Sequence, residues 1–313
     1  MVEKELTILI PTYNQGKFIS ETINSILNQT IMPNEILISN NHSTDTTDLV
    51  LAKYYNHKLI KIFKPESHLT MIQNWNFLVK NVKTKYFSII SSDDFFEKNF
   101  VEEFMLCKSS LFGYYRFNFN IVDGYGKKID TTSLRSVPVI QKFPYNFLNQ
   151  FYGPKGGFAA SVYKTKLVRE VSYFSESLNF YADWKMLLDL SELTNFYFNR
   201  KIVSNYRQYI RDRDNIVYKR AVQGGLKDHL LIFDKIKEKI INNNLSKYMY
   251  LLKFSIQVHF YEYLKILNEK DSSFIQKIKN YSNKNHIKKD KFFLSIYLKK
   301  FFLRIFEFSL KFR

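Results

Sequence analysis

Residues 86–94 read Tyr-Phe-Ser-Ile-Ile-Ser-Ser-Asp-Asp. The first part, Tyr86–Ile90, is rich in aromatic and β-branched residues, and it predicts a buried β-strand. Asp93 and Asp94 follow where this strand ends, which is the edge of an open α/β sheet where ligands bind. Adjacent carboxylates in a cleft suit Mg²⁺ or Mn²⁺ bound jointly with substrate phosphates. The simpler alternative is a solvated turn that caps the next helix, because Asp is common at helix N-termini.

The first third of the chain alternates strands and helices around this stretch. Besides 86–90, the pattern predicts strands at 6–10, 35–39 and 59–63, and helices at 18–27 and 71–82. A further helix is expected to start at Ser43 as its cap and to continue through Tyr54. Strands that alternate with helices of this length indicate βαβ units in a parallel, Rossmann-like sheet.

The pattern changes after Phe96. Residues 114–122 alternate like an antiparallel strand, and 123–126 read as its hairpin turn. The later elements expected are a helix at 178–190, strands at 196–198 and 203–209, and helices from about 217 with polar breaks at 242–244 and 280–285. The chain is therefore expected to end in a helical region.

Composition limits the classes of protein that fit. With 313 residues and 45% hydrophobic residues, the chain can bury a large core. The single cysteine, Cys107, excludes an internal disulfide and lies in an apolar run, so we expect an inert buried thiol. Six scattered His give no zinc spacing, and no stretch reaches the roughly 18 uncharged apolar residues of a membrane span. Without a visible signal peptide, a cytoplasmic protein is expected.

The net charge of +18 requires a partner or another physical reason. Nucleic acid, an anionic membrane surface and phosphate-bearing substrates are all candidates. Lys and Arg accumulate after about Arg200, whereas the first 130 or so residues are roughly balanced. This gradient indicates a catalytic half followed by a surface-binding half.

Several separate motifs occur in a characteristic order. From the N-terminus they are Pro11-Thr12-Tyr13-Asn14, Asn40-Asn41-His42-Ser43-Thr44-Asp45, Asn74-Trp75-Asn76, Asp93-Asp94, Tyr181-Ala182-Asp183-Trp184 and Tyr206-Arg207. This set, spread over about residues 5–215, closely resembles the family-2 glycosyltransferases, inverting enzymes of the GT-A fold that use nucleotide sugars. The resemblance implies an α/β GT-A domain in residues 1–215, with a Rossmann-like mixed sheet flanked by helices. A basic helical region would occupy residues 216–313.

The resemblance also implies roles for individual residues. The positions that match the nucleobase and ribose site are Pro11, Thr12, Tyr13, Asn14 and Asn40. Asp93 and Asp94 match the DXD site, which holds the ribose and the metal, Mn²⁺ or Mg²⁺, that bridges the diphosphate. Asp183 matches the general base. These roles agree with the chemistry, because the leaving diphosphate gains from a bound cation and an inverting transfer needs one base for the acceptor hydroxyl.

Two positions depart from the family pattern. Asn40 stands where Asp is common, and although its amide can still bind a base edge, the expectation of a UDP-sugar becomes weaker. Ser91 stands where many members carry the first Asp of the DXD motif. Metal binding therefore falls on Asp93 and Asp94, and either can be the direct ligand.

Two other classes of protein share some of these features. A nucleic-acid-binding protein would explain the charge, but no known binding motif is present and the aromatic residues lie mostly in apolar runs. A nucleotidyltransferase would share the sheet and the carboxylates, but it usually carries a Gly-rich basic loop after the first strand. Here that loop has a single glycine, Gly16, and no arginine. We therefore expect no nucleic-acid partner and transfer of a sugar, a hexose or N-acetylhexosamine.

The acceptor is expected to be a glycan or a lipid-linked molecule in surface polysaccharide synthesis, such as lipopolysaccharide or capsule. Residues 292–312 combine many apolar residues with a narrow, mostly basic face at helical spacing. This segment predicts either a packing helix or a helix that lies on an anionic membrane. The second alternative would place the enzyme peripherally on the inner face of the cell membrane.

Overall fold

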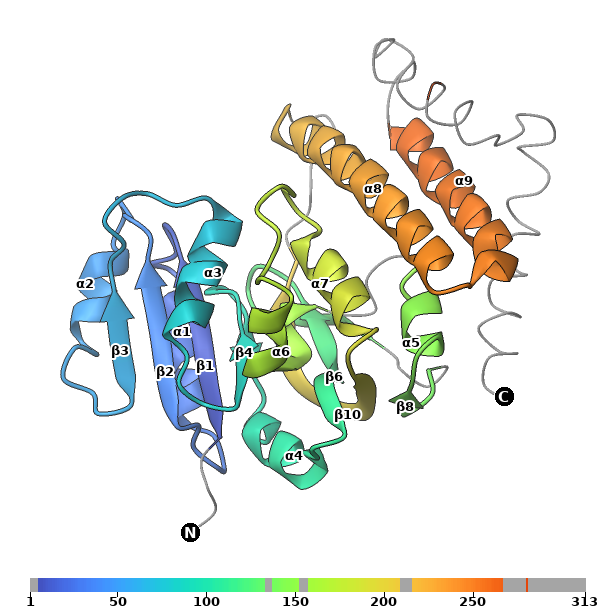
Figure 1. The fold of residues 1–313 in the computed structure, drawn as a ribbon. Helices are drawn as coiled ribbons and strands as arrows, with labels where there is room; N and C mark the ends of the chain where they lie inside the picture. The colour runs from blue at the N-terminus through green and yellow to red at the C-terminus, as the bar shows by residue number, and fades with distance from the viewer. Residues whose placement is uncertain (1–4, 133–136, 152–156, 209–215, 267–279, 281–313) are drawn as a thin grey trace. The chain divides into compact units, whose positions relative to one another are not determined.

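A mixed sheet of ten strands organises the part of the chain that the structure describes (Figure 1). The computed structural model describes residues 5–132, 137–151, 157–208, 216–266 and 280. Neighbouring strands follow the order β3-β2-β1-β4-β9-β6-β10-β5, with β7 beside β6 and β8 beside β10. The predicted α/β class, a mixed sheet with flanking helices, is confirmed.

The strands of the sheet are β1 (Leu6–Thr12), β2 (Glu35–Asn40), β3 (Ile60–Phe63), β4 (Tyr86–Ile89), β5 (Phe95–Phe96), β6 (Phe112–Val122), β7 (Lys128–Thr131), β8 (Ile140–Gln141), β9 (Ser161–Lys164) and β10 (Asn195–Arg207). The α-helices are α1 (Ile19–Leu27), α2 (Thr47–Ala52), α3 (Met71–Asn81), α4 (Phe100–Cys107), α5 (Tyr145–Leu148), α6 (Thr165–Glu170), α7 (Ala182–Leu190), α8 (Ile216–Asn242) and α9 (Met249–Ile266). Two short 3₁₀ turns, Phe158–Ala160 and Ser246–Tyr248, complete the described elements.

The first four strands run parallel, so their carboxyl ends meet at one edge of the sheet. Thr12 at the end of β1 pairs with Asn40 at the end of β2, and Leu9 of β1 pairs with Ile89 at the end of β4. The loop after β1, the turn after β2 and the turn that carries Asp93 therefore lie along the same edge. This edge is the one that the sequence predicts for ligands.

Alternation along the strands builds two apolar layers. Leu6, Ile8 and Ile10 of β1 belong to a core that also contains residues of α1 and α4. On the other side, α3 packs on β1 and β2, and its Trp75 meets the rings of Phe158 and Phe174 edge-on. Trp75 is thus a packing residue, as its apolar neighbours suggest.

Elements that differ from the sequence-based expectation include β10 and α2. The strands expected at 196–198 and 203–209 form one strand, β10, whose pairing with β6 shifts register between Phe198 and Ile202. Extra residues in one strand of a pair bend that strand locally without ending it. The expected cap of α2 is also wrong: the helix begins after Thr46, and Ser43 instead accepts a hydrogen bond from the main-chain N–H of Asn14.

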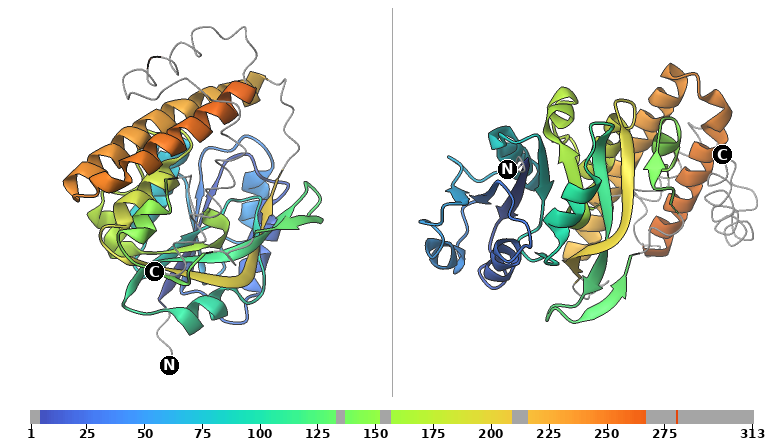
Figure 2. Two further views of the ribbon diagram at one scale, coloured as in Figure 1. Left: turned by 90° about the vertical axis from the view of Figure 1, so that its right-hand side faces the viewer. Right: turned by 90° about the horizontal axis from the view of Figure 1, so that it is seen from below.

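The chain divides into two compact units. The first contains Met1–Phe147, Lys155–Ser177 and Ala182–Ile210, and the second contains Leu148–Pro154, Leu178–Tyr181 and Arg211–Arg313. In the second unit, α8 and α9 lie side by side (Figure 2). The polar break expected at 242–244 is where α8 ends. The break expected at 280–285 and the amphipathic segment 292–312 lie outside the described residues, apart from Asn280. None of the helices described is both long and apolar enough to cross a membrane.

Candidate functional site

The loop after β1 is joined to the segment before α2 by hydrogen bonds from main-chain N–H groups to side-chain oxygens. The N–H of Gly16 donates to Oδ2 of Asp45 at 3.0 Å, and the N–H of Thr44 donates to Oδ1 of Asn14 at 2.7 Å. Gly16 is required by close approach, because a Cβ there would lie 2.2 Å from Oγ1 of Thr46. Burial raises the pKa of Asp45, but hydrogen bonds from Thr47 and Gly16 outweigh it and lower the pKa. Asp45 therefore holds this loop in place.

The predicted nucleotide residues differ in exposure. Tyr13 is 47% exposed and Asn14 is exposed, whereas Thr12 is buried and Pro11 is half-buried. The Tyr13 ring meets the ring of His68 edge-on at 4.9 Å, so two rings from different loops lie together at this edge. Such rings offer a surface on which a planar base can stack.

Asn40 lies at the same edge, but its side chain is engaged within the protein. Its Nδ2 donates to Oδ1 of Asp48, and its Oδ1 accepts from the N–H of Ser43 at 3.3 Å. The sequence-based expectation was contact with a base. The bond to Asp48 brings an additional carboxylate to the edge where the family usually has an Asp.

The two acidic residues after β4 have different environments. Asp93 is half-buried, whereas Asp94 is only 2% exposed. Burial, followed by the nearby charge of Asp93, raises the pKa of Asp94 well above its usual value. Oγ1 of Thr22 in α1 donates to the main-chain oxygens of Ser92 and Asp94 at 3.0 and 2.7 Å. These hydrogen bonds thus hold the turn against α1, and the Asp94 side chain is buried.

Arg207 at the end of β10 holds this turn from the other side. Its main-chain N–H donates to Oδ1 of Asp94 at 2.7 Å, and its Nε donates to the main-chain oxygen of Asp93 at 2.8 Å. The guanidinium also donates to the main-chain oxygens of Asp123 and Gly124, at 3.3 and 3.1 Å, in the β6–β7 hairpin turn. Its Nη2 pairs with Oε2 of Glu21 in α1 at 2.5 Å. One buried side chain therefore joins α1, the acidic turn and the hairpin.

Asp183 lies at the start of α7, in a half-buried position. Burial raises the pKa of its carboxyl to about 6, although hydrogen bonds from main-chain N–H groups, that of Trp184 among them, and the charge of Arg116 act in the opposite direction. Oδ1 of Asp183 accepts from the N–H of Trp184 at 2.8 Å. A carboxyl with a pKa near neutrality can take up a proton during a reaction.

The strand register relates Asp183 to the acidic turn. Arg116 of β6, which interacts electrostatically with Asp183, pairs with Ser161 of β9. The main-chain oxygen of Ser161 accepts from Oγ of Ser88, near the end of β4. The charge of Arg116, which acts on Asp183, therefore lies on a strand that β9 connects to the carboxyl end of β4.

A metal ion would have to share its coordination with a ligand at this site. No group of three or more His, Cys, Asp or Glu side chains arranged to hold a metal is found among the residues described. Mg²⁺ and Mn²⁺ need no such cage, since one or two carboxylates plus phosphate oxygens and water suffice. The half-buried carboxyl of Asp93 fits this requirement. Asp94 fits it less well, because its Oδ1 already accepts from Arg207.

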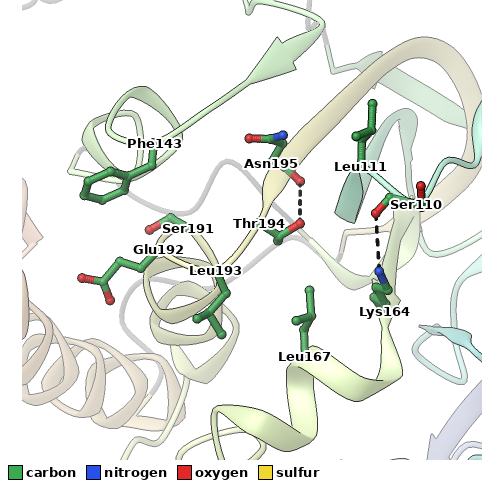
Figure 3. Close-up of a pocket in the computed structure, with 10 residues that line it drawn as sticks. All are labelled: Ser110, Leu111, Phe143, Lys164, Leu167, Ser191, Glu192, Leu193, Thr194 and Asn195. Carbon is green, nitrogen blue, oxygen red and sulfur yellow. Dashed lines mark hydrogen bonds between the residues drawn. The ribbon is translucent and has the colours of Figure 1, made fainter.

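A surface cavity of about 330 Å³ lies at the opposite edge of the sheet (Figure 3). It is lined by residues such as Lys164, which pairs with Tyr86 at the start of β4, and Asn195, the first residue of β10. Asp93 follows the other end of β4. This cavity is therefore separate from the acidic turn.

Sequence reasoning did not assign roles to Arg207, Arg116 or Glu21. Arg207 is part of a family motif, but its hydrogen-bond partners lie 83 to 186 positions away in the sequence. Arg116 sits in a strand, where an inward charge breaks the apolar pattern. That break in pattern is the signal that could have identified it.

Comparisons with known proteins show what this chain is similar to. Residues 7–107 match the family described as Glycosyl transferase family 2. The chain is 27% identical to the chondroitin synthase of Escherichia coli over 252 residues, which covers 78% of this chain and 34% of that protein. Residues 1–349 of TarS from S. aureus, solved with UDP-GlcNAc, share 15% identity at a TM-score of 0.58, with 90% of this chain and 89% of that one covered. A Pyrobaculum calidifontis mannosyltransferase, solved with GDP-Man and Mn²⁺, shares 11% identity at a TM-score of 0.54, with 98% and 86% covered.

The curated relatives are longer than this chain, which spans 29% to 41% of three glycosyltransferases that it matches. The family match covers β1 to α4, the part that contains the loop after β1, the turn after β2 and the acidic turn. The solved structures share the fold beyond that part. Together these observations show that residues 7–107 are similar to glycosyl transferase family 2, and that the chain shares its fold with solved glycosyltransferases.

Proposed function

We propose that this protein transfers a sugar from a nucleotide diphosphate donor to a hydroxyl group of a glycan or lipid-linked acceptor, with inversion at the anomeric carbon. The observation that carries the proposal is the acidic turn after β4, which is anchored by Thr22 and Arg207 at the edge shared with β1 and β2. Tyr13 and Asn14 at the same edge would contact the nucleoside. Relatives solved with UDP-GlcNAc and GDP-Man support a nucleotide-sugar donor.

Asp93 is the proposed ligand of a divalent cation, Mn²⁺ or Mg²⁺, that would neutralise charge on the leaving diphosphate. The half-buried carboxyl of Asp93 and the inward bond of Asp94 to Arg207 favour this division of roles. Asp94 then contributes by fixing the turn. A mannosyltransferase of the same fold with Mn²⁺ supports the choice of ion.

Asp183 is the proposed general base. As the acceptor oxygen attacks the anomeric carbon, its O–H proton passes to the Asp183 carboxylate and the bond to the diphosphate oxygen breaks. A base on the face opposite the leaving group gives inversion. The pKa of about 6 suits this role, because the carboxylate is ionised at neutral pH but still accepts a proton.

The donor can be tested without knowing the acceptor. The full chain would be incubated with UDP- and GDP-sugars and Mn²⁺ or Mg²⁺, and slow release of nucleoside diphosphate would be measured. Asp93→Ala should abolish release, whereas Asp130→Ala, a change of an exposed Asp in β7, should not. Release that persists in Asp93→Ala and in EDTA would contradict the metal assignment.

Synthesis of a polysaccharide is the proposed context, because a relative is named a chondroitin synthase and another a hyaluronan synthase. Lipopolysaccharide or capsule are the proposed products, and a UDP-hexose or UDP-N-acetylhexosamine the proposed donor. Residues 292–312 are proposed, on their sequence alone, to contact anionic lipid at the inner face of the membrane. Truncation after Asp290 should then release the protein from anionic liposomes and leave donor hydrolysis measurable. Equal sedimentation of the truncated and full chains would contradict this role.

A further inference from the structure

Helix α8 binds the segment that immediately precedes α7. The carboxylate of Asp228 in α8, which is fully buried, accepts hydrogen bonds from three consecutive main-chain N–H groups. They belong to Asn179, Phe180 and Tyr181, and the shortest bond to each is 2.8, 2.6 and 3.1 Å long. Nδ2 of Asn179 adds a fourth bond at 2.9 Å. Both carboxylate oxygens of Asp228 are thus engaged by one short segment.

Two neighbours of Asp228 in α8 contact the same segment. A Cβ at Gly224 would lie 2.6 Å from Cε2 of Phe180, so a larger residue there would force the Phe180 ring to move. The ring of His229 meets the ring of Tyr181 edge-on, with 4.6 Å between centroids. Gly224 and Asp228 are four residues apart and so are neighbours on one face of the helix, and His229 follows Asp228 directly. The segment is therefore held at three successive residues.

This arrangement is unusual for a contact that serves packing alone. A buried carboxylate is unfavourable unless hydrogen bonds fully satisfy it, and an apolar residue would fill the space without that requirement. Bonds between a charged oxygen and main-chain N–H groups are strong and directional. They fix the path of the backbone, and the chain passes directly from Tyr181 into Ala182 and Asp183, at the start of α7.

We propose that Asp228 is a positioning residue for Asp183. This inference rests on the proposed function, in which Asp183 takes the acceptor proton. Tyr181, whose N–H donates to Asp228, is separated from Asp183 by two peptide bonds. A shift of residues 179–181 therefore displaces the Asp183 carboxylate. Displacement of a base by about 1 Å can lower the rate of the chemical step by orders of magnitude. Donor binding, which involves the turn after β4, does not depend on the hydrogen bonds between Asp228 and residues 179–181.

The first test is Asp228→Asn in the full-length protein. An amide retains the shape but replaces one acceptor oxygen by a donor, so at least one main-chain N–H loses its partner. We expect kcat for transfer to an acceptor to fall at least about tenfold. The KM for the donor and acceptor-independent donor hydrolysis should change less than about twofold. Asp234→Asn, six residues further along the same helix at an exposed position, is the matched control and should leave all of these unchanged.

A second variant disturbs the contact between α8 and residues 179–181 without changing any charge. Gly224→Ala places a methyl group against Phe180 and should give the same selective fall in kcat, at unchanged donor KM. If both variants lower the melting temperature but keep kcat for transfer, Asp228 is a structural residue only and the inference is wrong. Failure of the proposed function would look different: Asp183→Asn itself would then retain transfer.

Discussion

The main-chain N–H of Arg207 donates to Oδ1 of Asp94 at 2.7 Å, while its Nε donates to the main-chain oxygen of Asp93 at 2.8 Å. One residue of β10 therefore holds both members of the acidic pair, Asp94 through its carboxyl and Asp93 through its main-chain oxygen. The bond turns Asp94 into the protein and leaves the carboxyl of Asp93 half-buried. Neighbouring residues of the same type thus have different expected roles.

Alanine at the two acidic positions should therefore have different effects. Asp93→Ala should keep the melting temperature and lower transfer by about three orders of magnitude, because it removes the proposed cation ligand. Asp94→Ala leaves the Arg207 N–H buried without its acceptor, and it should lower the free energy of unfolding by about 1–3 kcal/mol. Denaturant unfolding and donor hydrolysis, measured on both variants, check this. Equal loss of stability at the two positions would contradict it.

Arg207→Lys tests the anchoring of the turn. Lysine keeps the charge but offers a single nitrogen, which cannot bond Glu21, the Asp93 carbonyl and the β6–β7 hairpin turn together. We expect a loss of about 3 kcal/mol in unfolding free energy and weaker donor binding, because a buried network is broken. Glu21→Gln is the milder comparison, since Glu21 is 49% exposed on its side chain and an amide still accepts. A thermal shift assay with and without nucleoside diphosphate measures both effects.

The strands β1 to β4 and their shared edge were predictable, because their apolar runs and connecting helices follow simple periods. The start of α7 could not be predicted in this way. The sequence pattern extends from Leu178, but the helix begins at Ala182, and the N–H groups of residues 179–181 donate to Asp228, which is distant in sequence. Local patterns carry no information on such a partner.

Within the site too, residues in a local motif were predictable, whereas contacts between distant residues were not. Asp93, Asp94 and Asp183 stand out because each has a recognisable motif. The pairing of Arg207 with Glu21 joins residues 186 positions apart, and only the folded sheet brings them together. The division of roles between Asp93 and Asp94 likewise follows from a contact with β10.

The raised pKa of Asp183 predicts two pH effects. As a base it must be ionised, so kcat for transfer should fall as the pH decreases through about 6. The stability of the folded protein depends on pH in the opposite sense. The pKa of Asp183 is about 6 in the folded state and 3.8 ordinarily, so between these two pH values the folded state binds more protons than the unfolded state. The free energy of unfolding therefore decreases as the pH rises. Asp183→Asn cannot ionise. It should lose transfer at least about a hundredfold, yet at pH 8 unfold with a free energy on the order of 2 kcal/mol higher than the parent.

Denaturant unfolding of the parent and Asp183→Asn proteins at pH 4 and pH 8 measures the second effect. The difference between the two proteins should be small at pH 4, where the parent carboxyl is protonated in the folded state. An unchanged difference at both pH values would show that the Asp183 pKa is not raised in the folded protein.

Arg116 should set the acid limit of the reaction through its charge. The guanidinium stays protonated and is buried in β6, where its positive charge lowers the pKa of Asp183 against the effect of burial. Arg116→Met keeps a long side chain and removes the charge, so the pKa of Asp183 should rise above about 6 and the acid limb of kcat should move to higher pH. At pH 9 the variant should recover much of the parental kcat. The double variant of Arg116→Met and Asp183→Asn should show no fall of kcat at acid pH. If kcat of Arg116→Met falls at the same pH as that of the parent, this electrostatic role is excluded.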